Sequence, residues 1–90
     1  MFRFVHASDL HLGAAFEGIR GVSPDAADAL HRATYSAFDA VIRTAEENAA
    51  AFVVLAGDLC NRADGNLRAE LALRKAANRL HESGIATFIV

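Results

Sequence analysis

Three side chains of types that commonly bind metal ions follow two apolar segments of the chain. Asp9 and His11 come directly after the apolar run 2–8, and Asp58 follows the run 52–56 closely. Carboxylate and imidazole ligands suit Mn²⁺, Fe²⁺ or Zn²⁺ better than Ca²⁺, and this group lacks the thiolates typical of a structural zinc site. The sequence therefore predicts a divalent metal site formed by Asp9, His11 and Asp58.

Strands and helices alternate along the chain. Apolar density and a high content of β-branched and aromatic residues predict strands at 2–8, 52–56 and 85–90. A helix is expected from Ser23-Pro24 to about Asn48, because serine is a favoured N-cap and proline is favoured at the first helical position. A second helix is expected to end at Gly84. The stretches Leu10–Val22 and 57–66 between these elements are expected to be loops.

This order predicts an α/β fold, in which a three-stranded parallel sheet is joined by two helices in right-handed crossovers. Strand 2–8 is apolar at both alternating sets of positions, which predicts burial on both of its faces. Ligands of parallel sheets bind at the carboxyl ends of the strands, where Asp9 and Asp58 are expected to lie. An extended backbone after the first strand would place the side chains of Asp9 and His11 on the same side.

A pair of metal ions about 3.5–4 Å apart, bridged by one carboxylate, is the usual arrangement for in-line displacement at phosphorus. Asp58 is the natural bridge, because it ends the strand beside Asp9 and His11. The pattern assigns no residue of the chain as a catalytic acid or base.

The composition of the chain argues against several classes of protein. The chain has 9 Lys and Arg against 11 Asp and Glu, so a net charge of −2 gives no electrostatic footprint for nucleic acid. Its single cysteine, Cys60, cannot form an internal disulfide, which agrees with a reducing cytoplasm. No apolar run approaches the roughly 18–20 residues of a membrane span. A soluble cytoplasmic protein without membrane association is therefore expected.

The motifs Asp9-Leu10-His11-Leu12-Gly13 and Gly57-Asp58-Leu59 resemble those of the calcineurin-like metallophosphoesterase superfamily. The resemblance is strongest to its DNA-repair exonuclease branch, of the type of the nuclease subunit of SbcCD, and covers the N-terminal segment of that family. It implies that Asp9 and His11 bind a first metal ion and that Asp58 bridges to a second. The implied cofactor is two Mn²⁺ ions, with Fe²⁺ or Zn²⁺ as alternatives.

The resemblance also implies the domain organisation and partners. The family's next motif, Gly-Asn-His-Asp, follows its third strand, and the chain ends at Val90 before it. Residues 1–90 are therefore expected to be a single, partial metallophosphoesterase domain, the N-terminal part of a larger α/β sandwich, with little hydrolase activity alone. The complete enzyme is expected to hydrolyse phosphodiester bonds, to act on DNA and to pair with an SMC-like ATPase subunit.

Each candidate residue also has a plain structural interpretation. Asp9 and Asp58 could cap the segments that follow them, but two acids at equivalent strand ends beside His11 favour a functional role. His6 lies within the first strand and is expected in the core, or in support of a metal ligand. Cys60 has no accompanying base, so a nucleophilic role is not expected.

The remaining polar residues are expected to be ordinary surface groups. Asn61 could reach Asp58 but is better explained as a turn residue. His31 and His81 lie among polar neighbours on the predicted helices and are expected to be solvated. The cations of the second helix could contact DNA phosphates, although a solvated helix face fits the net charge better. They are Arg68, Arg74, Lys75 and Arg79.

Two other functions fit parts of the pattern. A receiver-like signalling module also carries acids at strand ends that bind Mg²⁺, but it favours adjacent acids where this chain has Asp-x-His. A non-catalytic fragment that forms a homo-oligomer through an exposed sheet face is the other alternative.

Overall fold

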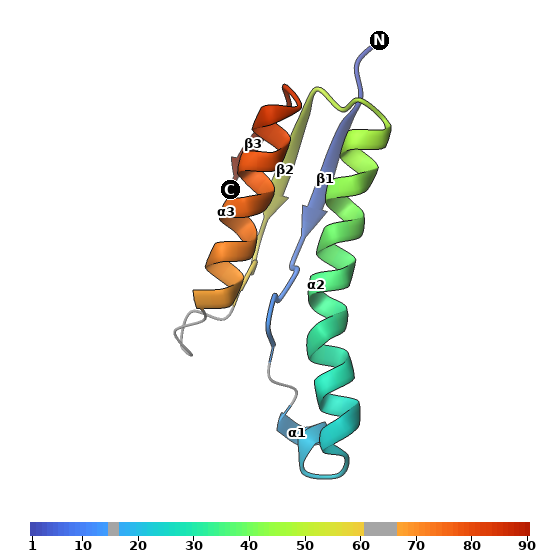
Figure 1. Cartoon of the computed structure of the whole chain (residues 1–90), viewed down its shortest axis with the longest axis vertical. Coiled ribbons are helices and arrows are strands. Elements are labelled where there is room, and N and C mark those ends of the chain that lie inside the picture. The colour runs from blue at the N-terminus through green and yellow to red at the C-terminus, as the bar shows by residue number, and fades with distance from the viewer. Residues whose placement is uncertain (15–16, 61–66) are drawn as a thin grey trace.

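The computed structural model describes residues 1–14, 17–60 and 67–90, and it has the α/β architecture that the sequence predicts. Three parallel strands lie in the order β1-β2-β3 and alternate with two long helices (Figure 1). The elements are β1 (Phe4–Ser8), α1 (Glu17–Arg20), α2 (Pro24–Glu47), β2 (Phe52–Ala56), α3 (Leu67–Glu82) and β3 (Ala86–Ile89). None of the helices in these ranges is both long and apolar enough to cross a membrane.

The first long helix begins and ends where its sequence signals place it. Ser23 is the N-cap, and its hydroxyl oxygen accepts a hydrogen bond from the Ala26 N–H at 3.2 Å. At the other end, the Asn48 N–H and side-chain amide both donate to the Thr44 carbonyl oxygen. These contacts satisfy backbone groups that the ends of a helix otherwise leave without partners. Between these caps α2 runs well past the carboxyl ends of the strands (Figure 1).

The segment predicted as a loop between Leu10 and Val22 contains the short helix α1. This single helical turn is closed by the N–H groups of Val22 and Ser23, which both donate to the Ile19 carbonyl. Four residues with Gly18 among them and Gly21 just after carry no helical periodicity, which is why the sequence pattern did not reveal the turn.

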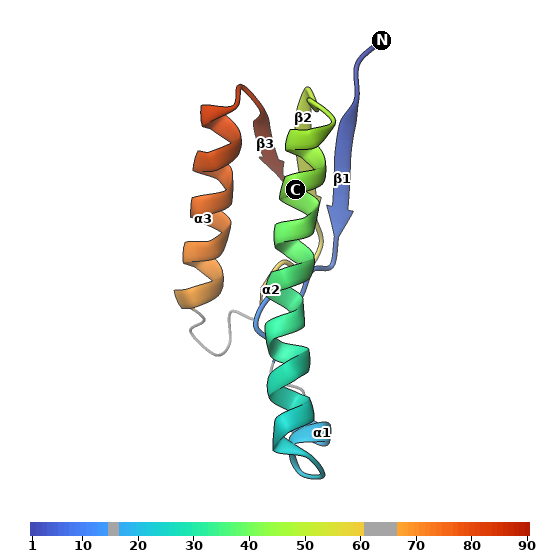
Figure 2. The same ribbon diagram turned by 45° about the vertical axis from the view of Figure 1, so that its right-hand side comes forward.

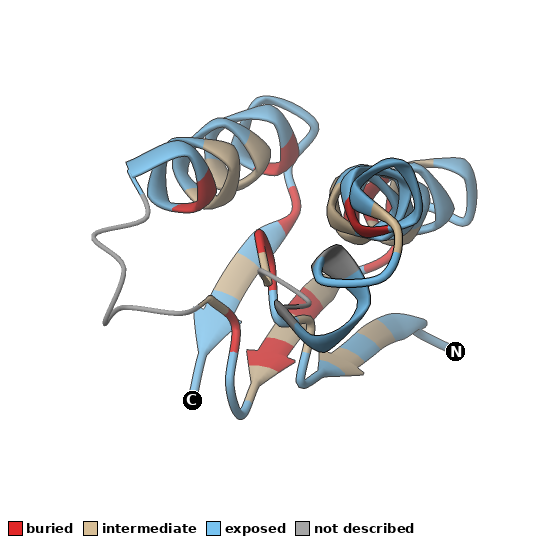
Figure 3. Cartoon of the chain, turned by 90° about the horizontal axis from the view of Figure 1, so that it is seen from below, coloured by how far each residue is buried: buried red, intermediate tan, exposed pale blue. Residues whose placement is uncertain are grey.

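Both long helices cover the same face of the sheet (Figure 3). The strands follow sequence order, so two crossovers of the same hand place α2 against β1 and α3 against β3 (Figure 2). The side chains of Val53 and Leu55 in the central strand point into this layer and are 0% and 2% exposed. They pack with residues of the helices and loops, including Leu12, Ile42 and Leu80.

The opposite face of the sheet is open, so the prediction that strand 2–8 is buried on both faces is wrong. Phe4 is 53% exposed, and His6 and Ser8 on the same side of β1 are also exposed. The reason is topological: β1 is an edge strand and both helices lie on the other side. Phe4 stacks on Phe52 at 5.0 Å, and Phe88 meets Phe52 edge-on at 5.9 Å. These rings form an aromatic patch on the open face.

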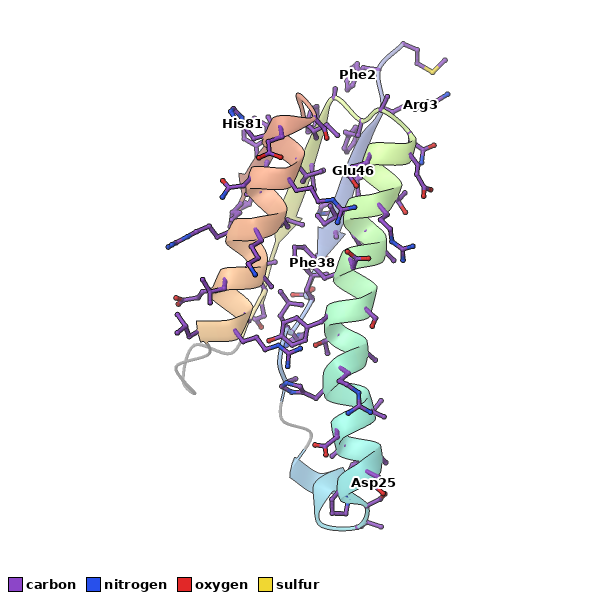
Figure 4. The ribbon with its side chains drawn as sticks, in the orientation of Figure 1. Phe2, Arg3, Asp25, Phe38, Glu46 and His81 are labelled. Atoms are coloured by element: carbon purple, nitrogen blue, oxygen red, sulfur yellow. The ribbon has the colours of Figure 1, made fainter. Side chains whose placement is uncertain are left out.

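A group of ion pairs joins the two long helices. The Arg79 guanidinium of α3 donates to Glu46 and to Asp39 of α2, and Glu46 lies on the side of α2 that faces α3 (Figure 4). Hydrogen bonding to Glu46 raises the pKa of Arg79 above its ordinary value. Because its charge is already paired, Arg79 fits a structural role better than the alternative of contacting DNA phosphates.

Candidate metal centre

The structure brings Asp9, His11 and Asp58 together at the carboxyl ends of β1 and β2. Each offers one ligand atom, and these atoms all lie within 4.8 Å of one another. All three residues are exposed to solvent. They come from two segments nearly fifty positions apart, which meet because β1 and β2 are adjacent and parallel. The residues that the sequence singles out for metal binding therefore occupy one small region of the surface.

The backbone that carries Asp9 and His11 is in the left-handed conformation at both residues, which corrects the expectation of an extended chain after β1. Asp9 has a φ angle of 55° and His11 a φ angle of 48°, both in the left-handed region. That conformation costs a non-glycine residue roughly 1–2 kcal/mol and persists where the surroundings hold it. Such strain is common at functional sites.

Backbone hydrogen bonds hold this segment against the loop that follows β2. Asp9 N–H donates to the Ala56 carbonyl at 3.0 Å, and His11 N–H donates to the Asp58 carbonyl at 3.1 Å. Leu12 N–H then donates to Leu59 O at 2.8 Å. Two of the three candidate ligands are thus joined directly through main-chain atoms, so their separation is fixed by the backbone.

Gly57 allows the Asp9 carboxylate to reach its position. A side chain at residue 57 would place a Cβ atom 2.2 Å from Asp9 Oδ1, and Gly57 itself has a φ angle of 73°. The next residue holds the same oxygen, since the Asp58 N–H donates to Asp9 Oδ1 at 3.1 Å. Oδ1 accepts this hydrogen bond and both oxygens of the carboxylate keep lone pairs, so Asp9 can be held by Asp58 and still bind a metal ion.

The loop after His11 is also held from α2, by residues that the sequence analysis did not assign to the site. Gly13 N–H donates to Thr34 Oγ1 at 3.1 Å. The Nδ1 atom of His31 lies 3.3 Å from the Ala14 carbonyl oxygen, to which it donates when it carries the proton. His31 is half-buried and packs on Tyr35, so the expectation that it is merely solvated is wrong.

Other residues considered from the sequence lie elsewhere. His6 is exposed on the open face of the sheet and not in the core, which corrects that expectation. His81 is exposed, as expected, at the end of α3 remote from the carboxyl ends of the strands (Figure 4). The Arg68 guanidinium stacks over the Tyr35 ring at 4.3 Å. Asn61 lies outside the described residues.

The donor set fits a divalent cation. Two carboxylates and an imidazole converge, and within residues 1–14, 17–60 and 67–90 no salt bridge reaches either Asp9 or Asp58. A bound cation would neutralise the charge of these two carboxylates. Mixed oxygen and nitrogen ligands are those that Mn²⁺, Fe²⁺ and Zn²⁺ accept. Asp9, His11 and Asp58 are the residues that would hold the ion.

Comparison with known proteins agrees with this chemistry. The family model described as calcineurin-like phosphoesterase matches residues 2–90. The uncharacterized metallophosphoesterase YhaO of Bacillus subtilis (strain 168) is 34% identical over 87 residues, which are 97% of this chain and 21% of that protein. The chain thus spans about a fifth of the length of this relative. No solved structure matches this chain.

Proposed function

Since the chain belongs to the calcineurin-like phosphoesterase family, whose members are metal-dependent hydrolases, we propose that Asp9, His11 and Asp58 bind a divalent metal ion that takes part in phosphoester hydrolysis. The observation that carries this proposal is the convergence of three ligand atoms within 4.8 Å at the carboxyl ends of two adjacent strands. A parallel sheet presents its ligand sites at that edge. The family match also decides against the receiver-like module as an alternative.

Each residue has a distinct role in this proposal. Asp9 offers a carboxylate oxygen, and the Asp58 N–H holds this carboxylate through Oδ1. His11 offers an imidazole nitrogen, and Asp58 offers the carboxylate that would be shared with a second ion. When bound, such ions activate a water molecule and neutralise charge on the phosphoryl oxygens. The chain's own contribution is to hold the three ligands in place on strained, hydrogen-bonded backbone.

The more specific part of the proposal is a phosphodiesterase of the DNA-repair exonuclease type, with two Mn²⁺ ions and with Fe²⁺ or Zn²⁺ as alternatives. It is supported by the resemblance of the motifs around Asp9 and Asp58 to that branch. DNA as substrate, an SMC-like ATPase as partner and a cytoplasmic location are part of the same proposal. The net charge of −2 adds no support for DNA as the substrate. Contacts with DNA phosphates would therefore have to come from residues outside 1–90.

Residues 1–90 are proposed to form one part of a larger α/β sandwich. The aromatic patch on the open sheet face supports this, because large apolar patches on a soluble protein usually mark a contact surface. A homo-oligomer formed through the same patch is the alternative. The described residues offer one group of three metal-binding side chains, so the chain alone is expected to hydrolyse phosphodiesters very slowly.

Titration calorimetry with Mn²⁺ tests the metal site. The chain is expected to bind Mn²⁺, and Asp9→Asn or Asp58→Asn is expected to weaken binding at least tenfold, since each removes a charged ligand. Asp25→Asn is the matched control, because this carboxylate lies at the far end of α2 (Figure 4). Equal affinity in the Asp9, Asp58 and Asp25 variants would refute the assignment.

Hydrolysis of bis-p-nitrophenyl phosphate with Mn²⁺ tests the expected reaction. A longer protein that contains this segment is expected to release p-nitrophenol, and the Asp58→Asn variant of that protein is expected to lose the activity. The chain of residues 1–90 is expected to show little turnover. Turnover by residues 1–90 at the rate of a complete family enzyme would contradict the proposal that they are only part of the catalytic domain.

A further inference from the structure

The loop that carries His11 has a second support, which comes from the middle of α2. Thr34 lies 21 positions beyond Gly13 in the sequence, and its hydroxyl oxygen accepts the Gly13 N–H at 3.1 Å. The same hydroxyl donates to the His31 carbonyl at 2.8 Å. That donation fixes the hydroxyl hydrogen toward the helix, so a lone pair of the oxygen is directed at Gly13.

This acceptor matters because the Gly13 N–H is removed from water. Gly13 is buried, and Leu12 before it is 0% exposed. A buried backbone N–H needs a hydrogen-bond partner, and leaving it without one disfavours the conformation that buries it. Without Thr34 the segment after His11 would be expected to move so that the N–H could reach water.

Movement of that segment would act directly on a candidate metal ligand. His11 and Gly13 have φ angles of 48° and 74°, so two of the three consecutive residues 11–13 are in the left-handed region. A conformation of this kind persists where several contacts hold it. On one side these contacts come from the loop after β2, through Asp58 and Leu59. On the other side they come from Thr34, and from His31 at the Ala14 carbonyl.

We propose that Thr34 is a positioning residue for the metal centre, which holds the His11 loop through the Gly13 N–H without touching the metal ion itself. The inference rests on the proposed metal-binding role of Asp9, His11 and Asp58. It adds a residue of α2 to a site otherwise built from the two strand ends. Partners that orient metal ligands commonly change metal affinity by 10- to 100-fold when they are removed.

Three substitutions separate the hydrogen bond from simple packing. Thr34→Val keeps the branched shape but removes the acceptor, whereas Thr34→Ser keeps the acceptor. Thr44→Val makes the same chemical change on the same helix, where the Thr44 hydroxyl donates to the Ala40 carbonyl and is exposed. Titration calorimetry with Mn²⁺ measures the affinity of each variant, and hydrogen exchange followed by NMR measures protection of the Gly13 amide.

Thr34→Val is expected to weaken Mn²⁺ binding about tenfold and to expose the Gly13 amide to exchange. Thr34→Ser and Thr44→Val are expected to bind Mn²⁺ as the unmodified chain does. If Thr34→Val keeps the affinity of the unmodified chain, the positioning role is refuted while the metal site stands. If the unmodified chain binds no Mn²⁺, the proposed metal site fails and the positioning role fails with it.

His31→Phe provides a second test if Thr34→Val does not fold. Phenylalanine keeps a ring beside Tyr35 but cannot donate to the Ala14 carbonyl, so this variant removes the other α2 contact with the loop. It is expected to weaken Mn²⁺ binding several-fold, at the lower end of the range for such partners. Unchanged affinity in a folded His31→Phe variant would refute a contribution of His31 to the position of the His11 loop. Thr34→Ala, which removes the same acceptor as Thr34→Val, would then decide the role of Thr34: unchanged Mn²⁺ affinity in it would overturn the proposal.

Discussion

Replacing Gly57 by alanine is expected to remove most metal affinity while lowering the stability of the fold only modestly. The added Cβ atom would lie 2.2 Å from Asp9 Oδ1 and 3.0 Å from Asp9 Cγ. The Asp9 carboxylate must therefore move by roughly 1 Å or rotate away, which exceeds the roughly 0.5 Å within which a functional group needs to be held. Mn²⁺ affinity is expected to fall 10- to 100-fold.

The cost to stability is smaller because the atom that must move is the end of an exposed side chain. The Asp9 carboxylate can turn toward solvent, where water molecules donate to it in place of the Asp58 N–H. What remains is the cost of placing alanine at a φ angle of 73°, about 1–2 kcal/mol. For a chain of this size each kcal/mol corresponds to about 4–8 °C in the melting temperature.

Gly84→Ala is the matched control for this experiment. Gly84 has a φ angle of 78°, but a Cβ atom there would meet nothing within 4 Å. Both variants are expected to lose similar stability in thermal unfolding followed by circular dichroism, and only Gly57→Ala is expected to lose Mn²⁺ affinity in calorimetry. If Gly57→Ala binds Mn²⁺ as tightly as Gly84→Ala does, the position of the Asp9 carboxylate does not determine metal binding and the reasoning is refuted.

Three further predictions concern the N-cap of α2, the pH dependence of metal affinity and the open face of the sheet. Ser23→Ala removes the acceptor for the Ala26 N–H and is expected to cost about 1 kcal/mol in the free energy of unfolding; no change in a urea titration would mean that the cap does not contribute. Mn²⁺ affinity is expected to fall as the pH is lowered, because protons compete for the two carboxylates and the imidazole; affinity independent of pH would argue against these ligands. Phe88→Glu places a charge in the aromatic patch, so any self-association of the chain seen by sedimentation velocity is expected to decrease. Unchanged self-association would show that the patch is not the contact surface.

Much of the fold could be predicted from the sequence because local signals and tertiary structure agree. β2 occupies 52–56 as expected, and α2 starts after Ser23, where its capping signals indicate, and ends close to the expected Asn48. The exposed face of β1 could not be predicted from its apolar pattern. Whether that pattern means burial on both faces depends on where the helices pack, and both of them lie on one side of the sheet.

The candidate site was predicted in its composition but not in its detail. Asp9, His11 and Asp58 could be grouped because equivalent ends of adjacent parallel strands meet at one edge. The left-handed backbone at Asp9 and His11 has only a weak sequence signal, since aspartate and histidine adopt this conformation more often than most non-glycine residues but neither requires it. The contact between Gly13 and Thr34 joins a loop to a helix far along the chain, so it depends on how α2 packs beside β1 and not on any local pattern.

Titration of the chain with Mn²⁺, compared with its Asp58→Asn variant, tests the central claim most directly. Saturable binding of Mn²⁺ by the unmodified chain is expected, with at least tenfold weaker binding by the variant, because Asp58→Asn removes a charged ligand group while the backbone N–H of residue 58 still holds Asp9. Binding of equal strength in both proteins, or no binding in either, would contradict the claim.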